Sequence, residues 1–354
     1  MALLIMPKAA LPDWIDRLCA DHRVIGPRPL LDQTVFGEIH TAAELDLGYR
    51  TSILPPKKAI FPQQEEILRF HTNGGQVVEP VMDGQPTVVL GVHTCDMHAI
   101  ALLDAVFTEG HADQHYLARR ANTTLVSIEC LTPCMEHAFC KSMGTLTVPE
   151  DFDLHLTDLG DDYAVDVGSE KGAALVEGFG GVREATDDDY RRLDRAISEK
   201  WPRFPYRLEF DVTELPSLLT VSFNSVYWEE LGDRCLACAM CTNVCPTCYC
   251  FNVVDEVDFT LSAGKRFRVW DSCQLDEFAR VAGGHNFREK RAARQRHRFM
   301  RKGKYQLAAY NRMGCVGCGR CAAACLVHIT PVDTFNELYR RHGAAVDRPK
   351  EVRR

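Results

Sequence analysis

The 354-residue sequence predicts an α/β domain over residues 1–205, followed by an α-helical domain over residues 206–354. Three observations support this division. Apolar, β-branched segments flank a helix-like segment in the first part. The pattern becomes mostly helical beyond Leu215, and only this second part carries two copies of one tight cysteine spacing. Between the two parts, residues 201–206 (WPRFPY) contain two prolines and are typical of a linker.

The α/β prediction rests on the order of elements in the first part. Residues 86–92 (PTVVLGV) and 123–128 (TTLVSI) predict buried strands, and residues 97–107 predict a helix between them. The order strand, helix, strand indicates a parallel unit. Short alternating segments within residues 151–185, including 163–167, predict further strands or turns, and the charged residues 187–200 predict a helix.

Two runs of four cysteines in the second part share the spacing C-x2-C-x2-C-x3-C. This spacing is typical of paired 4Fe-4S clusters, in which the fourth cysteine of each run usually ligates the other cluster. The predicted ligand sets are Cys235, Cys238, Cys241 and Cys325 for the first cluster, and Cys315, Cys318, Cys321 and Cys245 for the second. Zinc is disfavoured, because zinc sites use paired C-x2-C hooks that close on one ion. The expected function is electron transfer.

The segment between the runs is long for a compact two-cluster ferredoxin. It comprises 69 residues, 246–314, and its pattern predicts helices at residues 276–282 and 288–304. Residues 224–231 predict a further helix that leads into the first run. The sequence therefore favours an all-helical, ferredoxin-like two-cluster module over the small β-containing ferredoxin fold.

Four cysteines of the first part form a separate candidate site. Cys130, Cys134 and Cys140 follow one predicted strand, and Cys95 follows the other. Loops that follow parallel strands gather at one edge of a sheet, so these four thiols are expected to meet. A third iron-sulfur cluster is one interpretation, with Asp96 or His93 as substitute ligands. The other interpretation is a set of reduced, partly buried cysteines.

Three more cysteines, Cys248, Cys250 and Cys273, follow or lie near the first run in sequence motifs CPTCYC and WDSC. They could hold an unusual cofactor or reduce a sulfur or disulfide substrate. Alternatively, they pack beside a cluster and tune its potential through weak hydrogen bonds. Cys19 has no neighbouring cysteine in the sequence and is expected to be an ordinary buried residue.

The charge distribution is uneven. Residues 288–354 carry 17 Lys and Arg against 5 Asp and Glu, which leaves 24 against 44 for the rest of the chain, although the net charge is −8. The basic residues either steer a partner protein by their field or offset the charge of buried thiolates. A nucleic-acid partner is disfavoured, because few stacking aromatic residues are interleaved with the basic ones.

Nothing in the sequence predicts export or insertion into a membrane. The apolar stretch before Lys8 and Pro12 is too short for a signal peptide, and no later segment has the length of a membrane span. A reducing, cytoplasmic location is therefore expected, and disulfides are not.

Six segments together resemble one iron-sulfur subunit family. They are GVHTCDMHAI (91–100), ECLTPCMEHAFCKSMG (129–144), CLACAMCTNVCPTCYCF (235–251), WDSC (270–273), GGHNFR (283–288) and CVGCGRC (315–321). The family is that of the β subunit of soluble NiFe sulfhydrogenases and of the iron-sulfur subunit of anaerobic sulfite reductase. The resemblance spans about residues 50–330. One departure is Leu326, which follows Cys325 where the usual pattern has proline.

The resemblance implies an α-helical ferredoxin domain after an α/β domain. It also implies a non-catalytic electron carrier that works beside a flavin subunit handling NAD(P)H. The catalytic partner is expected to be a NiFe hydrogenase subunit first and a sirohaem sulfite reductase second. The alternative to this relay is a catalytic sulfur or disulfide reductase that uses Cys248, Cys250 and Cys273.

Overall fold

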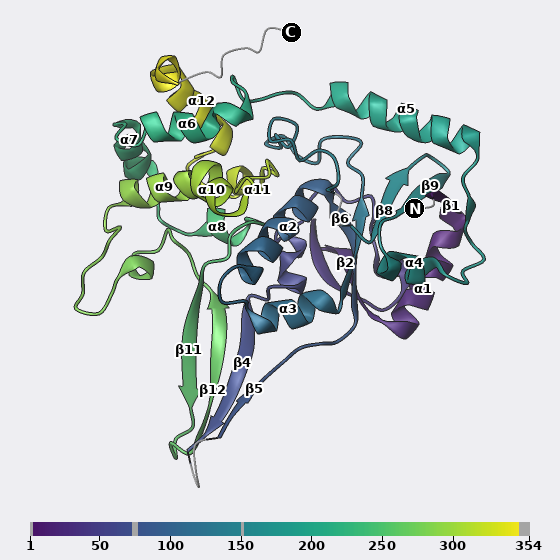
Figure 1. Ribbon diagram of the computed structural model, residues 1–354, viewed down its shortest axis with the longest axis horizontal. Coiled ribbons are helices and arrows are strands. Elements are labelled where there is room, and N and C mark those ends of the chain that lie inside the picture. The colour runs from purple at the N-terminus through teal and green to yellow at the C-terminus, as the bar shows by residue number, and fades with distance from the viewer. Residues whose placement is uncertain (1–2, 73–76, 150–151, 347–354) are drawn as a thin grey trace.

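The computed structural model describes residues 3–72, 77–149 and 152–346, and its first part is built around an eight-stranded mixed sheet (Figure 1). The strand order is β10-β1-β9-β8-β7-β6-β2-β3. The strands are β1 (Leu3–Pro7), β2 (Arg23–Leu30), β3 (Gln33–Ile39), β6 (Thr87–His93), β7 (Thr123–Ile128), β8 (Leu154–Asp158), β9 (Asp162–Val167) and β10 (Arg183–Glu184). Strands β2, β6, β7 and β8 pair in parallel, which confirms the predicted parallel unit.

Helices cover both faces of this sheet. On β6, Val88 and Leu90 face one apolar layer and Val89 faces the other, as the two-residue period of a strand requires. The first layer holds α1 (Leu11–Asp21) and α4 (Glu170–Val176), and the second holds α2 (Thr94–Thr108) and α3 (Gln114–Ala121). A strand buried on both faces is an almost continuous apolar run, which is why β6 could be predicted from its residues.

The second part contains a helical core. It consists of α6 (Leu215–Val221), α7 (Tyr227–Arg234), α8 (Met240–Asn243), α9 (Arg291–Met300), a π-helical turn (Arg301–Tyr305), α10 (Gln306–Tyr310), α11 (Arg320–Ala323) and α12 (Pro331–His342). Trp228, Phe299 and Phe335 are buried at its centre, with ring centroids 6.0 and 5.5 Å apart in succession. The helix predicted over residues 288–304 is confirmed, with its first turn at Arg291.

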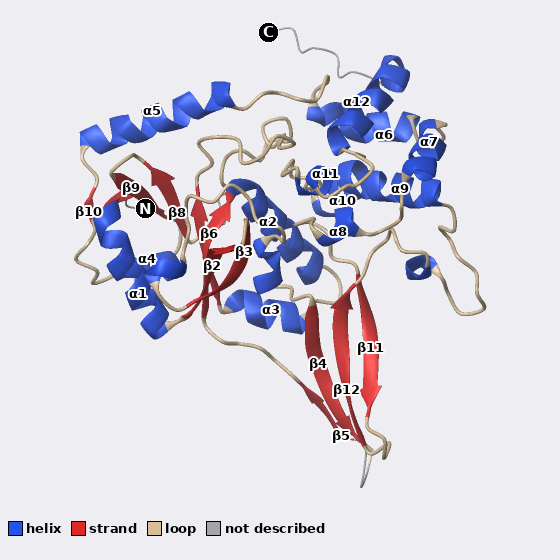
Figure 2. Ribbon diagram, turned by 180° about the vertical axis from the view of Figure 1, so that it is seen from behind, coloured by secondary structure: helices blue, strands red, loops and turns tan. Residues whose placement is uncertain are grey.

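The prediction of an all-helical second part is wrong. Residues between the cysteine runs form a hairpin of β11 (Phe251–Val257) and β12 (Ala263–Trp270). The hairpin joins β4 (Gln64–His71) and β5 (Val77–Pro80) in an antiparallel sheet of order β11-β12-β4-β5, which projects from the body as an arm (Figure 2). Residues 276–282 form only a short 3-10 turn, Glu277–Ala279. The hairpin escaped prediction because its partner strand β4 lies far away in the sequence.

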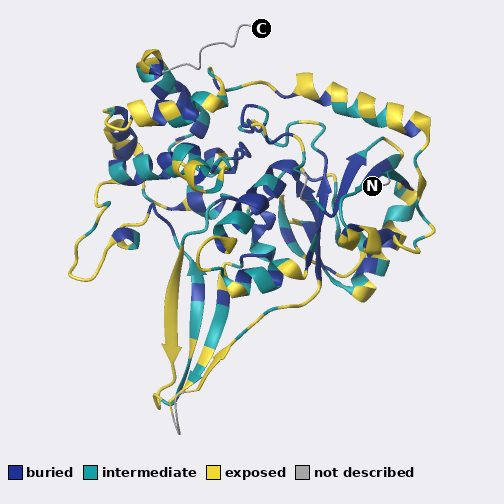
Figure 3. Cartoon of the chain, viewed as in Figure 1, coloured by how far each residue is buried: buried dark blue, intermediate teal, exposed yellow. Residues whose placement is uncertain are grey.

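The long helix α5 (Asp187–Arg203) connects the two parts, and most of its surface is exposed (Figure 3). Thr186 caps its start by accepting a hydrogen bond from the Asp189 backbone, and the Asp189 carboxylate accepts from the Thr186 backbone in return. Near its end, the buried Lys200 ammonium lies 2.9 Å from the Glu129 carboxylate. In the described part of the chain, no helix combines the length and apolar character needed to cross a membrane. Short 3-10 turns complete the fold at Lys8–Ala10, Ala42–Glu44, Pro56–Ala59, Val212–Glu214 and Gly343–Ala345.

A buried ion network fixes the base of the arm. The Glu65 carboxylate of β4 accepts hydrogen bonds from Arg119 of α3 at 2.7 Å and from Arg268 of β12 at 2.6 Å. All three side chains are buried. The carboxylate therefore ties a strand of the first part to a strand that lies between the two cysteine runs.

Substituting Glu65→Gln should destabilise the protein by about 3 kcal/mol, because two buried guanidinium groups would lose their common counter-charge. Anoxic chemical denaturation of the purified holoprotein measures this. Glu256→Gln, which alters an exposed carboxylate of β11, is the matched control and should change stability by less than about 0.5 kcal/mol. Equal stability of the two variants would contradict a structural role for the network.

Candidate iron-sulfur centres

The two cysteine runs fold in the same way at the level of the backbone. Each leads into a four-residue helix, α8 or α11. The residue before each helix has a left-handed conformation, with φ of 64° at Ala239 and 80° at Gly319. The residue two positions earlier does so as well, with φ of 55° at Ala237 and 69° at Gly317. The stretch from the first to the third cysteine is thus a repeated structural unit.

This turn directs backbone N–H groups at the sulfur atoms. The Ala237 amide donates to Cys235 Sγ at 3.3 Å. Burial raises the pKa of Cys315, and the Gly317 amide, which donates to this thiol, opposes part of that rise. The Ile329 amide donates to Cys325 Sγ at 3.3 Å. Hydrogen bonds of this kind stabilise a thiolate, which is the form that binds iron.

Cys245 lies close to the cysteines of the second run. Its charge raises the pKa values of Cys315, Cys318 and Cys321, although burial is the largest cause in each case and takes Cys315 to about 12. One cavity is lined by sulfur-bearing and aromatic side chains from both runs and their surroundings. It includes Cys241, Cys245, Cys315, Cys318, Cys321, Phe139, Phe299 and Phe335.

The chain after Cys325 contacts the start of the first run. Cys235 belongs to an apolar cluster against which both Cys315 and Cys325 pack. The Arg234 guanidinium donates to the carbonyls of Val327 and His328, at 3.1 and 3.3 Å, which joins the start of the first run to the end of the second. Among the described residues, no three His, Cys, Asp or Glu side chains are arranged to hold a single metal ion.

The four cysteines of the first part also come together. Cys95 begins α2 after β6, and Cys130 follows β7, so both lie at the carboxyl end of a parallel strand. Burial is the largest cause of the raised pKa of Cys130, and Cys134 and Cys140 raise it further. Burial also raises the pKa of Cys95, and Cys130 adds to that rise. Cys95 and Cys140 share one buried cluster with Cys318, and Cys130 packs against it.

The two substitute ligands considered for this set have other partners. The Asp96 carboxylate binds the Arg320 guanidinium through two hydrogen bonds of 2.7 Å, and both side chains are buried. The His93 ring stacks on Tyr49 with a centroid distance of 4.4 Å. Burial lowers the pKa of His93 to about 4, so the imidazole is neutral.

The loop that carries Cys134 and Cys140 rests directly on the second run. The Phe139 amide donates to the Gly317 carbonyl at 2.8 Å. A Cβ atom at Gly317 would lie 2.7 Å from the backbone of Cys140, and one at Gly319 would lie 2.7 Å from the backbone of His137. This close approach explains why glycine occupies both positions, whereas alanine occupies the equivalent positions 237 and 239 of the first run.

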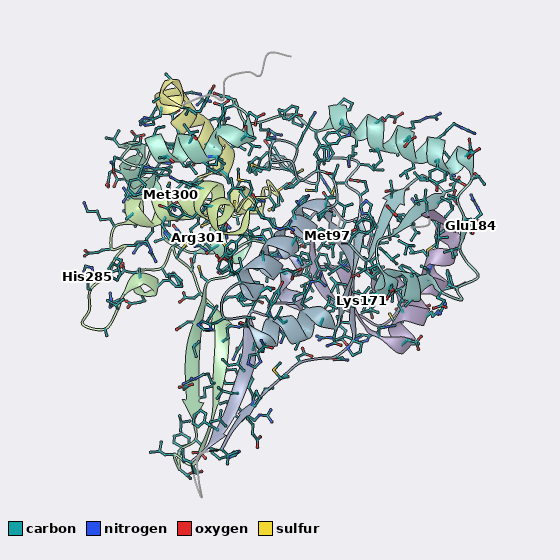
Figure 4. All side chains as sticks on the ribbon, viewed as in Figure 1. Met97, Lys171, Glu184, His285, Met300 and Arg301 are labelled. Carbon is teal, nitrogen blue, oxygen red and sulfur yellow. The ribbon has the colours of Figure 1, made fainter. Side chains whose placement is uncertain are left out.

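Three cations lie beside the thiols: Lys57 and Arg298 are buried, and Lys302 is partly buried. Lys57 donates to the carbonyls of Cys245 and Cys248, and burial lowers its pKa to about 8. Burial alone would lower the pKa of Lys302, but Cys245, Cys248 and Cys315 raise it above its ordinary value. Arg298 responds in the same way to Cys241 and Cys321. Figure 4 labels Met300 and Arg301, where α9 continues into the π-helical turn. Arg298 lies in α9 and Lys302 in that turn.

Each of the remaining thiols except Cys19 interacts with another cysteine. Interaction with Cys248 lowers the pKa of Cys245 well below its ordinary value. Interaction with Cys250 is the main cause that lowers the pKa of Cys273 to about 6. The Asp271 amide donates to the Cys250 carbonyl at 2.9 Å, so this second pair closes the base of the hairpin. Cys19 donates to the Ile39 carbonyl at 3.4 Å and takes no part in any of the three cysteine sets.

Sequence reasoning missed two glutamines beside the thiols. Gln295 Nε2 donates to Cys235 Sγ at 2.9 Å and to Gln274 Oε1 at 2.9 Å, and both side chains are buried. The spacing of Gln295, Arg298 and Lys302 is three and four residues, which places them on one face of a helix. A polar helix face with this spacing was the sequence feature from which a contact with the thiols could have been predicted.

Comparison with known proteins gives two matches. Residues 234–329 match the protein family described as "4Fe-4S dicluster domain". The protein "Sulfhydrogenase 2 subunit beta" of Pyrococcus furiosus is 36% identical over 328 residues, which cover 92% of this chain and 95% of that protein. No solved structure matches the chain.

Cys245→Ser should chiefly damage the cluster bound by Cys315, Cys318 and Cys321, although Cys245 is adjacent in sequence to the other three. Electron paramagnetic resonance of the reduced holoprotein measures this. The spectrum should match that of a Cys318→Ser variant, with Cys19→Ser as the unaffected control. A spectrum that matches Cys238→Ser instead would refute the crossed ligand sets.

Gln295→Leu should lower the reduction potential of the first cluster by roughly 60 mV. Its amide donates to a thiolate whose negative charge grows on reduction, and a loss of about 1.4 kcal/mol corresponds to 59 mV for one electron. A potentiometric titration followed by electron paramagnetic resonance gives the value. Gln306→Leu, a buried glutamine of α10, is the control and should leave this potential unchanged. No shift in the Gln295→Leu variant would exclude the tuning role.

Proposed function

Because the chain belongs to the iron-sulfur subunit family that includes the β subunit of sulfhydrogenase 2, we propose that it relays single electrons within a multi-subunit oxidoreductase. Electrons pass between a flavin subunit that handles NAD(P)H and a catalytic subunit. The observation that carries the proposal is that the three groups of cysteines, one in the first part and the two runs of the second part, lie next to one another in succession. We call this arrangement the row of cysteine sets. The set of the first part contacts the second run, and the second run shares a cavity with Cys241 of the first.

Two 4Fe-4S clusters occupy the crossed ligand sets in this proposal. Cys235, Cys238, Cys241 and Cys325 hold the first cluster, and Cys315, Cys318, Cys321 and Cys245 hold the second. The charge coupling of Cys245 to all three cysteines of the second run supports this assignment. Cys95, Cys130, Cys134 and Cys140 hold a third cluster, which their convergence at the carboxyl ends of β6 and β7 supports.

The bound clusters supply one-electron transfer, and the chain's own side chains set its conditions. Lys302 and Arg298 compensate buried negative charge, so they favour the reduced, more negative state of a nearby cluster. Gln295 and the backbone amides of the turns donate to the sulfur atoms. Phe139, Phe299 and Phe335 line the shared cavity and exclude water from it. Fixed dipoles and low exposure together set the potentials.

A NiFe hydrogenase subunit is the proposed catalytic partner, because the relative is named a sulfhydrogenase subunit. A sirohaem sulfite reductase is the second candidate for that place. The chain itself is proposed to be non-catalytic and to work in the cytoplasm. The hydrogen-bonded pair of Cys250 and Cys273 favours the alternative of sulfur or disulfide reduction. However, Cys273 is buried, so a bulky disulfide could not reach it in this conformation.

Anoxic affinity purification of the full chain from its native host, followed by mass spectrometry, tests the relay. We expect a flavoprotein and a NiFe subunit to accompany the chain in near-equal amounts. A sirohaem protein in place of the NiFe subunit would reassign the catalytic partner. Recovery of the chain alone, with its iron bound, would contradict the relay and leave thiol chemistry as the function to test.

A further inference from the structure

The first cysteine run reaches the surface, whereas its structural repeat does not. All sixteen cysteines lie in the described part of the chain, and Cys238 is the exposed one among them. Its equivalent in the second run, Cys318, is buried. The residues two positions before and after these cysteines show the same contrast. In the first run, Leu236 is 55% exposed and Met240 is 41% exposed. In the second run, the equivalent Val316 and Arg320 are each 3% exposed.

Two neighbours of the second run cause this contrast: the loop of residues 135–140, and α2, whose Asp96 carboxylate binds the Arg320 guanidinium. In the second run, the segment of residues 135–140 lies over Gly317 and Gly319 and covers the turn. That segment lies within the set of cysteines that holds the third cluster in the proposed function. In the first run, Ala237 is partly exposed and the neighbouring Leu236, Cys238 and Met240 are exposed, whereas Ala239 is buried. The repeat therefore has one surface covered by the next redox element and one surface left bare.

The bare surface is apolar and has a fixed shape. Leu326, which follows Cys325, is 75% exposed, whereas Pro246, which follows the equivalent Cys245, is buried. The Arg234 side chain holds the loop of Leu326 against the first run by its bonds to Val327 and His328. Leu236 and Met240 lie two residues to either side of the exposed Cys238, and Leu326 lies on the loop that Arg234 joins to this run. We call these four residues the port.

Basic groups stand beside the port. Arg291 is exposed and donates to the Cys235 carbonyl at 2.8 Å, and the exposed Arg234 is fixed by its own backbone contacts. Both guanidinium groups are therefore held in place at the edge of an apolar patch. An apolar centre with a charged rim is typical of a protein interface, and this rim complements carboxylates.

We propose that the port is the docking surface for a partner subunit that carries its own one-electron centre, presented on an apolar segment with acidic residues around it. This inference rests on the proposed relay and specifies one end of it. The partner's segment takes the place on the first run that residues 135–140 take on the second. The first cluster is then the one that exchanges electrons with the partner. Burial of three apolar side chains against the partner stabilises the complex.

The experiment uses a double variant, Met240→Glu with Leu326→Glu, and a matched control double variant, Leu31→Glu with Leu261→Glu. The control residues are exposed leucines in the turn between β2 and β3 and in the turn between β11 and β12. Each full chain is affinity-purified anoxically from the native host, and the recovered partner subunits are quantified per mole of chain. We expect at least tenfold less of one redox partner with the port variant and wild-type amounts with the control. Equal recovery from both variants would overturn the proposal.

A second measurement uses the unmodified protein, so it remains decisive if the port variant loses iron. Hydroxyl-radical footprinting compares Met240 in the intact complex with Met240 in the released chain. We expect at least threefold protection in the complex, and equal reactivity in an intact complex would refute docking at the port. Failure of the relay itself has a different signature, because the wild-type chain would then recover no redox partner at all.

Discussion

Burial of thiolate charge is the constraint on which the rest of this structure depends. An isolated charge in a protein interior is strongly unfavourable, so closely spaced buried thiolates need nearby cations. The Lys302 ammonium interacts electrostatically with Cys245, Cys248 and Cys315. Arg298 does so with Cys241 and Cys321. The inward positions of both cations account for part of the basic character of residues 288–354.

The two copies of the repeated turn have different surroundings. The two runs share backbone conformation, N–H donors and helix positions, so their sequences alone suggest equivalent clusters. Glycines 317 and 319 break this equivalence, because they admit the segment of residues 135–140. The row of cysteine sets therefore has one end in the α/β part and another end at the exposed Cys238.

Local patterns predicted much of the fold and part of the site. Strand β6 and helix α9 were predictable because their residues carry the period of the element. The meeting of Cys95 with Cys130 was predictable because parallel strands end at one edge of a sheet. The hairpin of β11 and β12 was not, since its stability comes from pairing with β4, which is distant in the sequence. The Gln295 contact depends on side-chain direction, which spacing suggests but does not establish.

The hairpin between the cysteine runs helps to hold the cysteine sets in fixed positions relative to one another. Its strand β12 ends at Trp270, whose ring centroid lies 4.2 Å from the ammonium of Lys57. Lys57 lies just before β4 and donates to the carbonyl of the ligand candidate Cys245 at 2.8 Å. Electron transfer depends steeply on the separation of the centres, so the proposed relay through both parts of the chain requires those parts to be held rigidly. The ladder between β4 and β12 and the ion network at Glu65 provide two restraints on that separation, which a flexible helical linker would leave free to vary.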